Sequence, residues 1–337
     1  MPKLKLLRRS SLPGLVLLAS VMAPAADFRV SGPYTYNNLS IFLLHGQSGE
    51  DGRKLLTLQE AMDQKKVVVF ETGQVNELSI ENQSSQDVFV QSGDIVKGGR
   101  QDRVLVTDLV LPAHSGKLPI AAFCVEHGRW TKRGNEQAEQ FSGSNRALPA
   151  KSLKLAVRDE KSQAKVWAEV ESTQSRLGAG HASSNGTMSA SSASPTSMQL
   201  ALEDKHVVDQ TGNYVQNLGR IIDGRNDVVG YAYTINGKLN SAEVYASHDL
   251  FRRMWPKMLQ ASAAEALAER RTEKAAAPPN VGVVKEALAS GDRGRVVSKE
   301  GADGVSVMKK DSATMILFEA RDKRAPDEYI HKSYIMK

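Results

Sequence analysis

Cysteine is almost absent from this chain of 337 residues, which contains only Cys124. No intramolecular disulfide can form, so stability must come from a hydrophobic core, even in an oxidising compartment. The segment from Pro119 to Val125 has the pattern of a buried strand, where a single cysteine acts as a small apolar side chain. We therefore favour a structural role for Cys124 over a nucleophilic one.

Familiar catalytic and metal-binding motifs are also missing. The sequence has no HExxH, CxxC, Walker A, GxGxxG or GxSxG pattern, and its seven histidines lack the i, i+4 spacing that favours zinc. We therefore predict no metal site, and no motif points to a cofactor.

Apolar runs long enough to span a membrane are missing as well. The run from Leu12 to Met22 is far shorter than the roughly 20 residues that a spanning helix needs. It follows the basic residues of 3–9 and precedes Ala23-Pro24-Ala25, a succession typical of a cleaved signal peptide. Residues 1–25 are therefore the predicted signal, with an uncleaved anchor as the alternative. The mature chain would begin near Ala26, be periplasmic or secreted, and span no membrane; without a cysteine in the signal it would not be a lipoprotein.

An excess of positive charge is nearly absent from the predicted mature chain. The sequence has 44 Lys and Arg against 38 Asp and Glu, and four of the cations precede the cleavage site, which leaves 40 against 38. Nucleic-acid binding depends on neutralising many phosphates with basic side chains. We therefore expect no nucleic-acid partner.

Short apolar segments separated by turn residues dominate the region from Val67 to Trp130. Long helical segments are missing between them, which favours antiparallel pairing over βαβ units. Amphipathic helical spacing appears at 57–66 and again after residue 160. The sequence predicts an α+β fold, built as a β-rich antiparallel sandwich or jelly-roll-like sheet with a few amphipathic helices.

The predicted domain organisation is one α+β domain over residues 26–337. Residues 178–197 contain no Asp, Glu, Lys or Arg and almost no large apolar residue, so we expect a disordered loop there. Residues 280–337 return to strand patterning and are expected to complete the main fold, with a separate subdomain as the alternative. At Asn236-Gly237, between two alternating segments, the pattern predicts a tight hairpin turn.

The segment from Ser92 to Trp130 concentrates glycines and ion-forming side chains, including Gly98-Gly99-Arg100-Gln101-Asp102-Arg103 and the block from Cys124 to Trp130. Together with Gly93-Asp94 and the segment from Gly237 to Trp255, these residues resemble a domain family named for its association with ADP-ribosylglycohydrolases and rhodanese-phosphatase-superfamily proteins. The resemblance implies a β-rich domain that handles a nucleotide-derived or other anionic ligand. It supplies no established catalytic residue.

The chemistry of this segment is compatible with an anionic ligand. Glycines allow close backbone approach, exposed N–H groups can form an anion-binding concavity, and arginine offers a planar fork for phosphate or carboxylate. The alternative is a glycine turn with structural ion pairs. The predicted ligand-binding residues are Asp94, Gly98, Gly99, Arg100, Gln101, Arg103, Glu126, Arg129 and Trp130.

Three functions remain open from the sequence. The first is non-catalytic binding of an anionic small molecule or partner. The second is a hydrolase or transferase that uses Glu126, His127 or Asp94 as acid or base, and the third is an envelope structural or interaction protein. Because Arg103 and Glu126 both end apolar strands, where an unpaired charge is costly, we also expect them to share one charge network.

Overall fold

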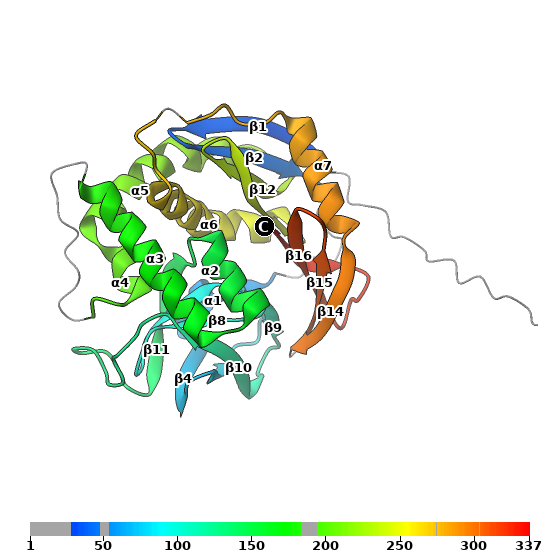
Figure 1. The fold of residues 1–337 in the computed structure, drawn as a ribbon. Coiled ribbons are helices and arrows are strands. Elements are labelled where there is room, and N and C mark those ends of the chain that lie inside the picture. Colours follow the sequence, from blue (N-terminus) through cyan, green and yellow to red (C-terminus); the bar gives the residue numbers. More distant parts are fainter. Residues whose placement is uncertain (1–27, 48–53, 183–193, 274, 303) are drawn as a thin grey trace, which may run out of the picture.

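A computed structural model describes residues 28–47, 54–182, 194–273, 275–302 and 304–337 (Figure 1). The fold is α+β, with 31% of residues in helices and 38% in strands, and its large sheets are antiparallel. The fold class predicted from the sequence is confirmed. The predicted signal, residues 1–25, lies outside the described residues.

The largest sheet has eight antiparallel strands and contains both early and late parts of the chain. Its order is β1 (Arg29–Tyr36), β2 (Leu39–His45), β12 (Val228–Ile235), β13 (Lys238–Tyr245), β17 (Tyr329–Met336), β16 (Met315–Asp322), β15 (Val305–Asp311) and β14 (Arg295–Ala302). The predicted hairpin turn at Asn236-Gly237 joins β12 to β13, and both residues have positive φ angles. Strands β14 to β17 continue this sheet beyond β13.

Six of the strands between residues 67 and 147 close into a barrel. Their order is β10 (Gly116–Cys124), β5 (Glu77–Asn82), β4 (Val67–Gln74), β11 (Gln140–Ala147), β7 (Asp94–Gly98) and β8 (Arg103–Leu105). Closure leaves these strands without an open sheet edge. A small sheet of β3 (Leu56–Thr57), β6 (Val88–Val90) and β9 (Leu109–Leu111) lies beside it, with β3 and β6 parallel.

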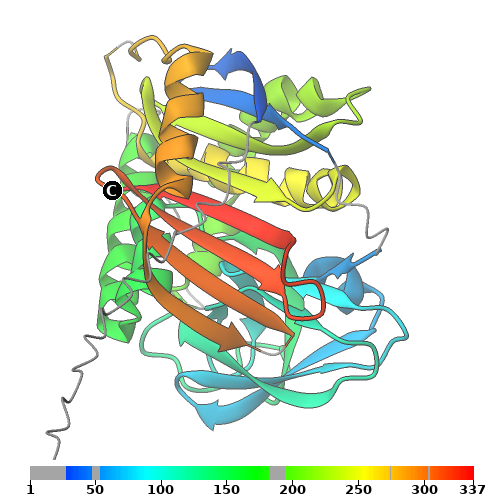
Figure 2. The same cartoon turned by 90° about the vertical axis from the view of Figure 1, so that its right-hand side faces the viewer.

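Helices cover both faces of the eight-stranded sheet. Helix α6 (His248–Ala268) is buried along most of its length and contacts β12, β13 and the barrel strand β11, with α5 (Lys205–Leu218) beside it. Helix α7 (Val281–Asp292) crosses the opposite face (Figure 2). Alternation along β12 sends Tyr231 and Tyr233 toward α6 and Ala232 toward α7.

The remaining helices connect these parts. They are α1 (Leu58–Asp63), α2 (Lys151–Leu155), a π-helical turn (Ala156–Glu160), α3 (Gln163–Ala182), α4 (Met198–Glu203) and a 3₁₀ turn (Gly219–Ile222). Helix α1 falls within the predicted helix at 57–66, and Thr57 and Glu60 form a reciprocal capping box at its start. No helix among the described residues is long and apolar enough to cross a membrane.

The polar segment at 178–197 differs from its prediction at both ends. Helix α3 continues through Gly178 to Ala182, and residues 183–193 lie outside the described residues. Ser194 and Ser197 are buried, because their hydroxyl groups donate to the carboxylates of Glu126 and Asp102. Hydrogen bonds to these buried carboxylates therefore hold Ser194 and Ser197 in place, although the stretch around them lacks large apolar side chains.

Candidate functional site

The two motif blocks meet at one end of the barrel. The turn after β7 contains Gly99 and Asp102, and Arg103 begins β8, where it is in register with Cys124 at the end of β10. An irregular loop from residue 125 to residue 139 then leads into β11. The predicted proximity of the glycine-arginine turn and the block that ends at Trp130 therefore has a topological basis.

The Gly98-Gly99 turn binds a carboxylate of the chain itself. Both glycines have positive φ angles, and the Gly98 N–H donates to Asp102 Oδ1 at 2.9 Å. A Cβ on Gly99 would lie 2.4 Å from the Phe141 ring, so close packing requires glycine there. The anion that this concavity holds is Asp102.

Asp102, Glu126, Arg129 and Arg133 form a buried cluster that we call the carboxylate clamp. Arg129 binds Glu126 with two hydrogen bonds of 2.6 and 2.7 Å, and Arg133 binds Asp102 with two of 3.0 and 3.1 Å. Arg129 also donates to the Gly99 carbonyl at 3.1 Å, and the Asp102 N–H donates to Glu126 at 2.9 Å. Bidentate arginine-carboxylate pairs are strong and directional, so the clamp fixes the loop against the turn.

The clamp keeps Glu126 ionised. Burial alone would raise the pKa of this carboxyl, but hydrogen bonds from Arg129, Ser194 and the Asp102 amide bring it below its usual value. A carboxylate with a lowered pKa is a poor proton donor near neutral pH. The same contacts occupy both of its oxygens.

Arg103 is fully buried but weakly paired. Its closest carboxylate contact is Glu71 Oε2, 3.5 Å from Nη2, and it donates to Gln101 at 3.4 and 3.5 Å and to Cys124 Sγ at 2.9 Å. Its Nε atom has no hydrogen-bond partner. The structure pairs Arg103 directly with Glu71 and Glu126 directly with Arg129, so any charge network that Arg103 and Glu126 share does not run through an ion pair between these two side chains. Sequence order gives no sign of Glu71, which comes from the other side of the barrel on β4.

Cys124 lies beside this arginine, buried at the end of β10. Burial raises the pKa of its thiol to about 11, although the Arg103 charge acts in the opposite direction. A thiol with such a pKa remains protonated at neutral pH and is not a ready nucleophile.

Trp130 and Arg100 form the exposed part of the site. Trp130 is 40% exposed, and two guanidinium groups lie near its ring, with Arg100 5.6 Å and Arg103 5.4 Å from the ring centroid. We call these three residues the arginine-tryptophan platform. Among the residues that the structure describes, the Arg100 guanidinium contacts no carboxylate; only its backbone N–H donates to Glu71.

Two predicted residues lie outside this arrangement. Asp94 begins β7, at the opposite end of the strand from Gly98, and forms a buried ion pair with Lys257 of α6. The ring of His127 is at the surface, where it packs edge-on against Trp167 at 4.6 Å. Glu126, Asp94 and His127 therefore do not converge on one pocket.

A second cluster of charges, which we call the central charge network, is not apparent from the sequence. His331 lies between Asp108, at 3.0 Å, and Glu243, at 3.1 Å, with all three side chains buried. Arg158 binds Asp108 at 3.1 Å and Lys154 binds Glu243 at 3.2 Å. Asp108 lies between β8 and β9, Arg158 in the π-helical turn, Lys154 in α2, and Glu243 and His331 on strands β13 and β17. In the sequence, only the i, i+4 spacing of Lys154 and Arg158 indicates part of this network.

Comparison with known proteins gives one family and no individual relative. Neither the curated proteins nor the solved structures that were compared gave a match. In the described part of the chain, no group of three or more His, Cys, Asp or Glu side chains is arranged to hold a metal ion. The model of the ARG and Rhodanese-Phosphatase-superfamily-associated Protein domain matches residues 27–335, the span that contains both motif blocks and the central charge network, and the chain therefore belongs to that family.

Proposed function

We propose that this protein binds an anionic small molecule at the arginine-tryptophan platform without catalysing a reaction. The ligand class that fits best is a phosphate-bearing nucleotide or an ADP-ribose derivative. Guanidinium groups match phosphate oxygens, and an exposed indole ring stacks on a base.

The observation that carries this proposal is the unequal pairing of the arginines. Arg129 and Arg133 have carboxylate partners at 2.6 to 3.1 Å, whereas Arg103 has one at 3.5 Å and an unbonded Nε. Arg100 has none among the described residues. Arg103 is fully buried, so the guanidinium group that an external anion can reach is that of Arg100, which is exposed and lacks a carboxylate partner.

Pairing of the carboxylates favours binding over acid-base catalysis. Glu126 is held by Arg129, and Asp94 is held by Lys257. Proton transfer needs a group within hydrogen-bond reach of a substrate, and both of these carboxylates face protein cations instead. The hydrolase or transferase alternative is therefore less well supported than a binding role.

Isothermal titration of the purified protein with ADP-ribose, ADP and pyrophosphate tests the platform. We expect Arg100→Gln and Trp130→Ala each to weaken binding by about tenfold, because each removes one direct contact with the ligand. Arg252→Gln on α6 is the matched control, since its side chain is 62% exposed and distant in the fold. Binding that is unchanged in both platform variants, or no binding of any of the three compounds, would contradict the proposal and leave the structural or interaction role.

We also propose that the protein is exported. The basic, apolar and Ala-Pro-Ala succession of residues 1–25 supports this location. Amino-terminal sequencing of protein recovered from its natural host is expected to begin near Ala26. A chain that retains Met1 in the cytosol would refute export.

A further inference from the structure

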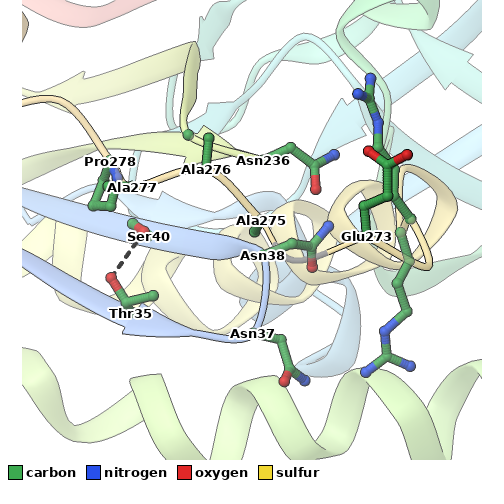
Figure 3. A pocket seen from close by; sticks show the side chains of 13 residues that line it. Thr35, Asn37, Asn38, Ser40, Asn236, Glu273, Ala275, Ala276, Ala277 and Pro278 are labelled. Atoms are coloured by element: carbon green, nitrogen blue, oxygen red, sulfur yellow. Dashed lines mark hydrogen bonds between the residues drawn. The ribbon is translucent and has the colours of Figure 1, made fainter.

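An open cavity of about 400 Å³ lies apart from the platform, at the edge of the large sheet opposite to β14. Its walls are the β1–β2 turn, the β12–β13 turn and the segment that follows α6 (Figure 3). This volume falls within the range of small-molecule sites. We call it the asparagine-arginine cavity.

Close packing defines the cavity walls. Asn37 and Asn236 both have φ near +52°, the left-handed conformation that asparagine tolerates. A Cβ on Gly237 would lie 2.7 Å from the carbonyl oxygens of Ala276 and Ala277, so glycine lets the segment after α6 close against the turn. Asn236 further donates to the Glu269 carbonyl at 2.9 Å. These contacts hold the β12–β13 turn against the segment after α6.

Polar side chains from separate segments converge on this space. The amide groups of Asn37, Asn38 and Asn236 lie along one side, and Glu273 lies across from them (Figure 3). The Asn38 amide is already used, because it accepts from Tyr214 Oη at 2.7 Å and donates to the Ala266 carbonyl at 2.8 Å. The Asn37 side chain is exposed in the lining of the cavity and lies within reach of Tyr214 Oη.

Two arginines give the cavity a positive charge. Arg270 makes one long hydrogen bond, 3.4 Å, to Gln210, and in the described part of the chain neither Arg271 nor Glu273 makes a side-chain hydrogen bond or ion pair. Among the lining residues that the structure describes, two guanidinium groups against one carboxylate leave a net charge of about +1. Thr35 and Ser40, which are hydrogen-bonded to each other at 2.8 Å, add hydroxyl groups to the lining.

We infer that this cavity binds a small hydroxylated anion, of the class of sugar phosphates and sugar acids. Arginine forks recognise the phosphate or carboxylate group. Amide and hydroxyl side chains, which both donate and accept, recognise the hydroxyl groups of the sugar. Neither group alone uses the whole lining: inorganic phosphate makes no use of the amide and hydroxyl side chains, and a neutral sugar makes no use of the charge of the two guanidinium groups.

Calorimetric titration of the full chain with glucose 6-phosphate, glucuronate, glucose and inorganic phosphate tests this inference. The first two are expected to bind at least about tenfold more tightly than the last two. Comparing glucose 6-phosphate with glucuronate shows whether phosphate or carboxylate is the preferred anion. If inorganic phosphate binds as well as glucose 6-phosphate, or if none of the four compounds binds, the inference is wrong.

Two substitutions locate the site. Arg271→Gln removes a charge, and Asn37→Gly removes an amide while retaining a residue that adopts positive φ without strain. Each is expected to weaken sugar-phosphate binding by about tenfold, whereas Arg252→Gln leaves it unchanged. Binding that weakens in Arg100→Gln but not in Arg271→Gln would place the sugar phosphate on the platform and overturn the inference. Binding that survives both Arg271→Gln and Asn37→Gly would place the ligand elsewhere and overturn the inference.

Discussion

Raising the pH should selectively weaken the central charge network. Burial alone would lower the pKa of His331, but the charge and hydrogen bond of Asp108, together with those of Glu243, raise it to about 9. The imidazolium then donates from both nitrogens, to carboxylates at 3.0 and 3.1 Å. Burial likewise opposes ionisation of Glu243, whereas Lys154 and His331 hold its pKa at about 2.

The size and sign of this effect follow from linkage. The folded pKa of His331 lies above its usual 6.5, so its stabilising contribution is complete below pH 6.5 and is lost as the pH rises through about 9. That shift corresponds to roughly 3 kcal/mol of unfolding free energy. The contribution of Glu243 has the opposite sense, because it is present above pH 4.5 and is lost as the pH falls toward about 2.

Urea unfolding followed by tryptophan fluorescence at about pH 6 and about pH 9.5 measures the histidine contribution. The unfolding free energy of the natural chain should fall by roughly 3 kcal/mol more than that of His331→Gln over this interval. His114→Asn, which changes an exposed histidine at a positive φ angle that asparagine tolerates, is the matched control and should behave as the natural chain does. Equal pH dependence in the natural chain and in His331→Gln would refute the reasoning.

Two further predictions concern the motif blocks. Gly99→Ala should lower the unfolding free energy by roughly 2 to 4 kcal/mol, because it places a Cβ 2.4 Å from the Phe141 ring at a positive φ angle; an unchanged urea midpoint would contradict this packing. Glu126→Gln and Arg129→Met should each cost roughly 3 kcal/mol, and the double variant should cost well below their sum, since it leaves no unpaired charge. Additive costs in the double-mutant cycle would show that the two side chains do not act as a pair.

Local features of the fold could be predicted from the sequence because their causes are local. The alternation of Tyr231 and Tyr233, followed by Asn236-Gly237, specifies a hairpin and its buried face. Closure of the barrel is different, because it depends on pairs such as Phe123 with Val104 that no local pattern specifies. The sequence therefore predicts the antiparallel β-rich class, and the structure alone adds the barrel.

The candidate site, too, could be predicted from the sequence only in part. Convergence of the glycine turn with the block at Glu126 could be predicted, because the two blocks flank neighbouring strands. Asp102 fits the alternative of a glycine turn with structural ion pairs, but the sequence does not show that its carboxylate accepts from the Gly98 amide. Asp108 and His331 are 223 positions apart in the chain, so only the folded structure shows their contact.

The order of strands in the large sheet determines when the protein can fold during synthesis. Ile41 of β2 pairs with Tyr233 of β12, so the first hairpin lacks its neighbour until nearly 200 further residues have been made. At roughly 5 to 20 residues per second, that wait lasts on the order of 10 to 40 s. The last strand, β17, then pairs with both β13 and β16. All six barrel strands are made long before this point, whereas the large sheet cannot be complete until β17 has been made.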